Sequence, residues 1–457
     1  MSVASFSKIL RRMRPHPVRV RKVIRLAYPV ALGMISITLL NVVDTAMLGR
    51  LGSTPLAAAG ISGVAYFAIV FSIAGIGIGV QTLTARRYGE GELLQCGQVL
   101  NAGIMLALLA GIPLVLASGA IAQGLSPFLS QHGDVVSLGA IYMRYRFLGA
   151  VFLLLNMVYR GFYNGIGDTK QQLVSAIIVT VSNILLDYAL IFGNLGSPKM
   201  GIAGAAIASS LATAFGSAYF LGISLMPKYR EVYRLYRHFV HALSRIQPIV
   251  RLSLPVMGQR LMSNGSFFVF FSIVARIGTL ELAASNIIRS VIGLSIMPAI
   301  GIGVAAMTLV GQNLGAKKPD EAEVFAWDAA KLAAYLMAAV GLLFVAFPRF
   351  IFMIYTSDPA VIALGRIPLV FLGLTQAFGG ISLVLEQSLQ GAGNTRYVML
   401  AEVLVCSLFY LPVAYLLGIR AHLGITGAWL GELVYWIMMS SLMAAKFRTG
   451  TWKSIKV

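Results

Sequence analysis

The sequence predicts an all-α polytopic membrane protein, with twelve transmembrane helices in two six-helix lobes related by an axis along the membrane normal. Three observations support this fold class. Of the 457 residues, 58% are hydrophobic and only 11% are charged, whereas about a quarter of the residues of a soluble domain are charged. Apolar stretches of membrane-spanning length recur along the chain, and its two halves resemble each other at a constant offset.

The apolar stretches are the predicted transmembrane helices. A helix needs about 20 apolar residues to cross roughly 30 Å of hydrocarbon. The stretches are continuous and rich in Gly and Ala, unlike the strands of a membrane barrel, which span about ten residues of alternating polarity. Their approximate limits are 24–48, 56–83, 97–120, 138–161, 171–192, 201–226, 249–275, 282–310, 327–347, 364–390, 397–418 and 425–445.

Five segments follow one another along the chain. A basic N-terminal segment, 1–23, precedes the N-lobe, 24–226, and a linker, 227–248, leads to the C-lobe, 249–446, and a short tail, 447–457. The linker mixes spaced Leu, Tyr and Phe with Arg, which predicts either a helix lying on the membrane surface or a disordered basic connection.

The positive charge is distributed unevenly about the predicted spans. The net charge is +20, and 26 of the Lys and Arg residues fall in the N-terminal segment, the linker, the tail and alternate loops. The opposite loops hold eight, to which we assign Arg144 and Arg146. This positive-inside bias predicts a multi-pass protein of the plasma (inner) membrane with both termini in the cytoplasm, and it argues against a nucleic-acid partner.

An internal repeat fixes the organisation. At a shift of 226 residues, four blocks recur in one register, which chance does not explain. Each half then contains six spans and enters the bilayer in the same orientation, as expected for an axis along the membrane normal, with a cavity between the lobes. The paired blocks begin at Arg25 and Arg251, Arg50 and Arg276, Gly75 and Gly301, and Gly165 and Gly391.

Several function classes are excluded by missing motifs. No stretch matches the phosphate-binding loop GxxxxGK[ST], so a self-contained ATP-driven pump is not predicted. No nucleophile with a base at suitable spacing points to an enzyme, and no cofactor is predicted. Cys96 and Cys406 imply no disulfide framework, and the histidines fall outside the spans. An ion gradient or downhill passage remains as the source of energy.

Two pairs of polar residues inside the spans are the candidate ion site. Asn41 and Asp44 are three residues apart in span 1, and Asn183 and Asp187 are four apart in span 5, so each pair shares a helix face. Two carboxylates at one cavity are coupled and can share a proton. With the Asn oxygens they could instead bind a hard cation such as Na⁺.

The predicted site is asymmetric between the halves. In the repeat register, Asp44 and Asp187 correspond to Phe270 and Val413. The C-lobe has a possible polar pair of its own, Arg260 with Glu386, for which a structural role is favoured.

Pro29 is a further candidate in span 1. It removes a helix hydrogen bond and predicts a hinge or a static kink, as does its repeat counterpart Pro255.

Five motifs resemble those of the multidrug and toxic compound extrusion (MATE) family, in its DinF-like branch. The resemblance implies a cavity that alternates between the membrane faces and export of cationic or amphipathic compounds driven by H⁺ or Na⁺. It also implies that Asp44, Asn183 and Asp187 form the cation or proton site, with Pro29 at a bend. The motifs are NVVDTAMLGRLG at 41–52, GVQTLTARRYG at 79–89, GIGDTK at 165–170, SNILLD at 182–187 and GQNLG at 311–315.

The sequence departs from the family pattern at several positions. Relatives of another branch carry acidic residues in span 7, where this chain has Met262, Ser263 and Asn264, and in span 10, where it has Gln376 and Gly379. These departures argue against a C-lobe cation site of that type. Some relatives have a Thr ligand near the position of Ala205, so the sodium alternative is slightly weakened.

The predicted function is therefore a secondary active multidrug efflux antiporter. It exchanges small-molecule drugs or toxic organic cations for H⁺ or Na⁺ by alternating access, as a monomer surrounded by membrane lipid. One alternative is a lipid-linked oligosaccharide flippase of the same superfamily, although only Arg260 and Arg289 lie deep enough to meet a diphosphate. Another is a channel or passive uniporter, which needs no coupled carboxylates.

Overall fold

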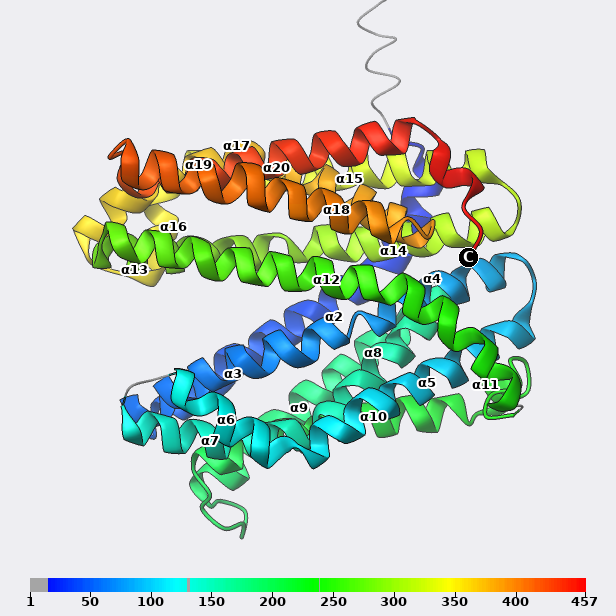
Figure 1. Ribbon diagram of the computed structural model, residues 1–457, viewed down its shortest axis with the longest axis horizontal. Helices are drawn as coiled ribbons and strands as arrows, with labels where there is room; N and C mark the ends of the chain where they lie inside the picture. The colour runs from blue at the N-terminus through cyan, green and yellow to red at the C-terminus, as the bar shows by residue number, and fades with distance from the viewer. Residues whose placement is uncertain (1–14, 130–131, 238) are drawn as a thin grey trace, which may run out of the picture. The chain divides into compact units, whose positions relative to one another are not determined.

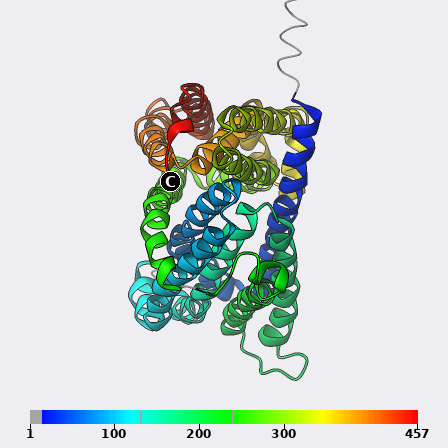
Figure 2. The same cartoon turned by 90° about the vertical axis from the view of Figure 1, so that its right-hand side faces the viewer.

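The structure is a computed structural model that describes residues 15–129, 132–237 and 239–457. In these residues the chain forms helices joined by short connections, and no β-strand occurs among them (Figure 1; Figure 2). The first fourteen residues of the predicted N-terminal segment lie outside the described part of the chain.

The helices group into two compact units. We call residues 32–257 the N-terminal unit, and residues 1–31 with 258–457 the C-terminal unit. The helices of residues 17–277 are α2 Pro17–Gly49, α3 Ser53–Ile73, α4 Ile76–Gly89, α5 Leu93–Leu116, α6 Ser118–Leu129, α7 Gly133–Leu148, α8 Ala150–Gly165, α9 Lys170–Phe192, α10 Ile202–Ser224, α11 Pro227–Arg230 and α12 Phe239–Ile277.

The rest of the chain, from residue 279, is helical in the same way. Its elements are α13 Thr279–Ser295, α14 Met297–Gly315, α15 Pro319–Ala346, α16 Pro348–Tyr355, α17 Pro359–Gly391, α18 Thr395–Val405, the π-helix η1 Cys406–Tyr410, α19 Leu411–Tyr415, the π-helix η2 Leu416–Arg420, α20 Gly424–Arg448 and the 3₁₀ helix η3 Thr451–Ser454.

Ten helical stretches among the described residues are long and apolar enough to cross a membrane, or eleven if α7 and α8 form one span bent by 45°. The predicted segment 249–275 lies in α12, a helix of 39 residues that is not among them. Several predicted spans are divided between helices: 56–83 between α3 and α4, 97–120 between α5 and α6, 138–161 between α7 and α8, and 282–310 between α13 and α14, while 397–418 runs from α18 through η1 and α19 into η2.

Helices α2 and α12 belong to both units. The boundary between the units falls after Ala31 in α2 and after Met257 in α12, and these positions are 226 residues apart, as the repeat requires. Pro29 and Pro255 each lie two residues before the boundary, and both helices run through their proline without a break. Residues 24–31 of the predicted lobe 24–226 therefore group with the C-terminal unit. Residues 249–257 of the predicted lobe 249–446 group with the N-terminal unit.

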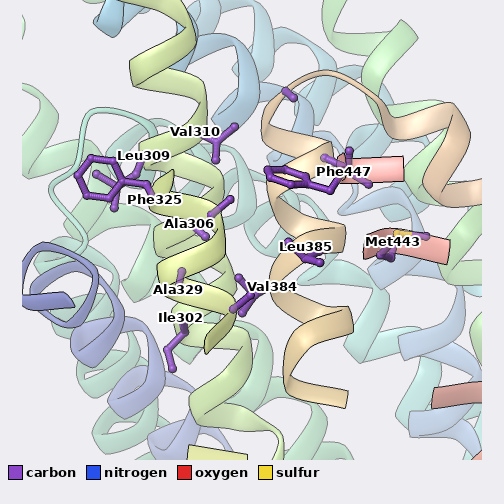
Figure 3. Packing of buried hydrophobic residues seen from close by; sticks show 14 of the residues in the cluster. Ile302, Ala306, Leu309, Val310, Phe325, Ala329, Val384, Leu385, Met443 and Phe447 are labelled. Carbon is purple, nitrogen blue, oxygen red and sulfur yellow. The ribbon is translucent and has the colours of Figure 1, made fainter. Parts of the chain in front are cut away.

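The core of the C-terminal unit is a cluster of buried apolar side chains. Figure 3 shows residues of α14, α15, α17 and α20 packed together in this cluster. Val23 and Ala27 of α2 are part of it. Small residues let these helices approach closely: a Cβ on Gly391 of α17 would lie 2.4 Å from the carbonyl oxygen of Met307 in α14.

Small residues also bring the helices of the N-terminal unit close together. A Cβ on Gly161 of α8 would lie 2.3 Å from the carbonyl oxygen of Gly77 in α4, and one on Gly77 would lie 2.5 Å from that of Met157. Because no larger side chain fits at this crossing, the two helices are held at backbone contact.

The linker differs from both predicted alternatives over residues 227–237. It packs against the N-terminal unit, with Tyr229 and Leu235 buried. The Asn101 side chain of α5 holds its backbone, since Nδ2 donates to the Arg237 oxygen (3.1 Å) and Oδ1 accepts from the Tyr236 nitrogen (3.2 Å). The rest of the predicted linker, from Phe239, is already part of α12.

Candidate functional site

Helices α2 and α9 of the N-terminal unit carry the candidate site. The buried face of α9 includes Ala176, Thr180, Asn183 and Asp187, whose spacings of three and four residues place them along one stripe of the helix. The hydroxyl of Ser36 in α2 donates to Thr180 Oγ1 (2.9 Å). This contact fixes α2 on the stripe about two turns before Asp44.

Asn183 joins the two carboxyl groups of the site. With its amide oriented so that both ends have partners, Nδ2 donates to Asp44 Oδ1 (2.8 Å) and Asp187 Oδ2 (3.2 Å), while Oδ1 accepts from the Ser209 backbone nitrogen of α10 (3.1 Å). In the opposite orientation Nδ2 reaches Ser209 Oγ (3.3 Å), but the amide oxygen then faces only acceptors. We therefore adopt the first orientation.

The carboxyl groups of Asp44 and Asp187 also lie beside each other, since a single Asn183 nitrogen donates to both. Two adjoining carboxyl groups can form a hydrogen bond with each other when one of them carries a proton. Asp187 is 1% exposed and Asn183 is fully buried, whereas Asp44 is half-buried. The geometry is therefore that of two adjoining carboxyl groups, one of them buried, that are placed to share one proton.

Arg146 of α7 is part of the same group and was missed in the sequence. Its guanidinium lies 4.8 Å from the ring centroid of Tyr66 in α3 and is a hydrogen-bond partner of Tyr142. It interacts electrostatically with both Asp44 and Asp187. The charge count places Arg146 in a loop, but it lies within the fourth predicted span, 138–161. A charged residue inside a predicted span is the signal that could reveal it.

Two other predicted site residues lie outside this group. Asn41 is exposed, and its backbone oxygen accepts from Thr45 Oγ1 (2.7 Å). Pro29 is buried in α2, fifteen residues before Asp44, which corresponds to roughly 22 Å along a helix. The site thus consists of Asp44, Asn183 and Asp187, and Arg146 acts on it electrostatically.

The predicted C-lobe pair is part of a separate buried network. Gln259 Nε2 donates to Glu386 Oε1 (2.7 Å), and Gln390 Nε2 donates to the same oxygen (3.3 Å) and to Gln259 Oε1 (3.0 Å). Arg260 is attracted electrostatically to Glu386. The Glu386 carboxyl group is therefore held by the side-chain amides of Gln259 in α12 and Gln390 in α17. The sequence did not predict these amide donors.

Glu402 of α18 is a second buried carboxyl of the C-terminal unit. It is 1% exposed and accepts hydrogen bonds from the hydroxyl of Ser263, from the thiol of Cys406 (3.6 Å) and from Tyr435, whose hydroxyl lies 3.2 and 3.1 Å from the two carboxyl oxygens. These donors come from α12, η1 and α20, so Glu402 ties three elements to α18.

The positions that correspond to the carboxyl pair are apolar in the C-terminal unit. Phe270, the counterpart of Asp44, is fully buried. Its ring stacks on Tyr410 at 5.5 Å and meets the edge of Trp429 at 4.9 Å. Val413, the counterpart of Asp187, lies in α19. At these two repeat positions, therefore, the N-terminal unit has carboxyl groups and the C-terminal unit has apolar side chains.

The site is suited to reversible binding of a proton or a small cation. Among residues 15–129, 132–237 and 239–457, no group of three or more His, Cys, Asp or Glu is arranged to hold a metal ion. The residues that could hold a sodium ion are those named from the sequence, Asp44, Asn183 and Asp187.

Comparison with known proteins decides the family. The model of the MatE family matches residues 29–189 and 255–416, which is more than half of the chain. The chain belongs to the MatE family. The second match begins 226 residues after the first, at the offset of the internal repeat. The predicted MATE resemblance is confirmed, while the DinF-like branch stays a prediction.

Curated relatives cover almost the whole chain. The probable multidrug resistance protein NorM of Thermotoga maritima is 27% identical over 434 residues, covering 95% of this chain and 93% of the relative. The multidrug resistance protein PmpM of Pseudomonas aeruginosa is 29% identical over 430 residues, covering 91% and 88%.

A solved structure shares the fold. The outward-facing conformation of a multidrug resistance MATE family transporter superposes with a TM-score of 0.89 at 21% identity, covering 96% of this chain and 97% of that one. The predicted all-α polytopic fold class is confirmed. The MatE chain is thus a multi-pass membrane protein and a transporter, and the prediction that it is not an enzyme is confirmed.

Proposed function

We propose that this MatE chain is a secondary active multidrug efflux antiporter. It exports cationic or amphipathic organic compounds in exchange for H⁺ or Na⁺ by alternating access. The observation that carries the proposal is the carboxyl pair of Asp44 and Asp187, bridged by Asn183 inside membrane-spanning helices. The printed names of the NorM and PmpM relatives support multidrug compounds as substrates.

The carboxyl pair supplies the coupling that an antiporter needs. A charge in the hydrocarbon region is costly and is normally placed where it has a function. Loss of the shared proton would leave two carboxylates in contact, which disfavours that arrangement. Ion binding therefore biases the conformation, and by linkage the conformation biases ion affinity. A passive channel needs no such pair.

Further parts of the proposal rest on the sequence. The concentration of Lys and Arg in alternate loops supports an inner-membrane protein with both termini in the cytoplasm. We also propose that the chain acts as a monomer and belongs to the DinF-like branch. The flippase alternative is not proposed, because the relatives that match over most of the chain are named multidrug resistance proteins.

The test is transport by the purified protein in liposomes. Wild type should export a fluorescent organic cation only when a pH or sodium gradient is imposed. Asp44→Asn, which cannot share a proton with Asp187 as a carboxylic acid does, should reduce this export to the background of empty liposomes.

The matched control is Asp134→Asn, since Asp134 is exposed at the start of α7 and should keep the wild-type rate. Full gradient-driven export by a folded Asp44→Asn protein would contradict the proposal.

A further inference from the structure

One face of α13 is polar and exposed although it belongs to the predicted membrane span 282–310. Asn286, Arg289 and Ser290 are exposed, and their spacings of three and four residues place them on one side of the helix. Arg289 lies about 15 Å along the helix from its start at Thr279, which is about half the thickness of the hydrocarbon. A charged residue at this depth normally faces water on a transport pathway and not lipid.

Two aromatic rings of α12 hold the guanidinium of Arg289. It lies 4.0 Å from the ring centroid of Phe267 and 5.7 Å from that of Phe271, and the two rings stack on each other at 5.6 Å. Both rings are half-buried, so part of each remains accessible beside the charge. Glu432 attracts Arg289 electrostatically, but the ion pairs among the described residues do not include Arg289. Its N–H groups are therefore not used by a carboxylate of the described chain.

The repeat register shows that the fold does not need this cation. Arg289 corresponds to Gly63, and Phe267 and Phe271 correspond to Asn41 and Thr45. Helices α2 and α3, which carry these counterparts, form without a guanidinium and without the two rings. The group of one cation and two rings is thus a feature of the C-terminal unit alone.

We propose that Arg289, Phe267 and Phe271 form a substrate subsite for amphipathic organic anions. A carboxylate or sulfonate of the exported compound binds the guanidinium, and the attached aromatic or apolar ring contacts the two phenyl groups. This inference rests on the proposed function and deepens it, because it adds a class of exported compound whose charge is opposite to that of the organic cations.

The guanidinium suits such a group in both geometry and charge. Its N–H donors form a planar fork that binds a carboxylate or a similar oxyanion through two parallel hydrogen bonds. A ring stacked on the face of the guanidinium leaves the donors in its plane available. Because the cation–aromatic contacts already hold the side chain in place, less conformational freedom is lost when the anion binds. A cationic compound gains nothing here, since Arg289 repels it.

The experiment compares two fluorescent probes that share one ring system and differ in charge. Purified protein is placed in liposomes of phosphatidylcholine, which has no net charge and so does not compete for the guanidinium. Export of pyrenesulfonate, an anion, and of pyrenyl trimethylammonium, a cation, is measured under an imposed pH or sodium gradient. Wild type should export both. Arg289→Gln should raise the half-saturating concentration of pyrenesulfonate by at least about tenfold, because a charge-assisted hydrogen bond is lost, and should not raise that of the cation.

Arg366→Gln is the matched control. Arg366 is an exposed arginine of α17 in the same unit, so the net charge changes equally, and export of both probes should stay at the wild-type level. Equal export of pyrenesulfonate by Arg289→Gln and wild type would overturn the inference, as would an equal loss of both probes, which indicates a structural role. Absence of pyrenesulfonate export by a wild type that exports the cation would also overturn it and leave the proposed function intact. Absence of gradient-driven export of both probes would contradict the proposed function.

A second variant tests the subsite if Arg289→Gln does not fold. Asn286 is exposed three residues before Arg289, so Asn286→Asp hardly changes the shape of the side chain but places a carboxylate beside the guanidinium. This carboxylate should compete for the N–H donors and repel the anion, and the half-saturating concentration of pyrenesulfonate should rise several-fold while that of the cation does not. An unchanged value for pyrenesulfonate would overturn the inference.

Discussion

At the scale of single residues, the amide of Asn183 determines how the two carboxyl groups meet. It makes three hydrogen bonds at once, two as donor to the carboxyl groups and one as acceptor from the Ser209 nitrogen of α10. A carboxamide is the side chain that can donate to two acids while accepting from a backbone nitrogen. An aspartate or a hydroxyl at this position could not do all three.

We predict that Asn183→Leu impairs transport and stability together. The leucine has a similar volume but leaves the Ser209 nitrogen and two carboxyl oxygens without their amide partner. A buried polar group that loses its partner typically costs about 1–3 kcal/mol. We expect a lower melting temperature in detergent and export slowed by at least about tenfold in liposomes, since about 1.4 kcal/mol corresponds to a factor of ten. An unchanged rate would contradict the bridging role of Asn183.

Helical spacing predicted part of this site and misplaced another part. The four-residue spacing of Asn183 and Asp187 placed both on the buried face of α9, as the structure has them. Asn41 is three residues from Asp44, yet it is exposed. Spacing relates residues within one helix, but the neighbouring helices decide which of them is covered. Arg146 comes from a third helix, and no sequence pattern connects it to the other two.

At the scale of elements, the linker is shaped by one glycine. A Cβ on Gly97 of α5 would lie 2.0 Å from the carbonyl oxygen of Tyr233, so the linker can lie directly on the helix only because this position has no side chain. The composition of the linker shows only that it mixes apolar and basic residues. It could not predict that α5 has room for the segment.

We therefore predict that Gly97→Ala displaces the linker and destabilises the protein. Overpacking of a filled contact typically costs about 1–3 kcal/mol, which should appear as a lower melting temperature. Gly119 in α6 is the matched control, because a Cβ there meets no atom within 4 Å. Equal melting temperatures of Gly97→Ala and Gly119→Ala would show that the linker does not need this contact.

The breaks within the predicted spans 282–310 and 56–83 differ in their sequence signals. Helix α14 begins with Met297 and Pro298, and proline is favoured at the first positions of a helix because it lacks the N–H group. This signal was present inside the span predicted at 282–310. Between α3 and α4 the break falls at Ala74 and Gly75, where apolarity alone gives no sign of a turn.

At the scale of the whole molecule, the repeat predicted most of the architecture. One offset accounts for the two family matches and for the unit boundaries in α2 and α12. It could not predict that residues 15–31 group with the C-terminal unit. That grouping depends on tertiary contacts: the Arg19 Nε atom donates to Asp328 Oδ2 of α15 at 2.6 Å, and Asp328 is only 3% exposed.

We predict that Arg19→Gln weakens the attachment of this segment. Asp328 keeps Lys331 at 3.5 Å but loses its shorter charged partner, and a hydrogen bond to a charged group contributes about 1.5–3 kcal/mol. The melting temperature should fall, whereas Arg21→Gln, at an exposed position of the same segment, should leave it unchanged. Identical values for the two variants would show that the ion pair does not hold the segment.

The aromatic packing around Phe270 has a consequence for how the duplicated halves have diverged. When Asp44 and Asp187 bind the coupling ion in one half, the corresponding positions of the other half need no ionisable side chain. Those positions can then evolve for packing alone. The effect of a natural amino-acid substitution should then depend on the half of the chain in which it lies. Changes near Asp44 should alter which gradients and compounds the transporter uses, and changes at Phe270 should alter how much folded protein a cell accumulates.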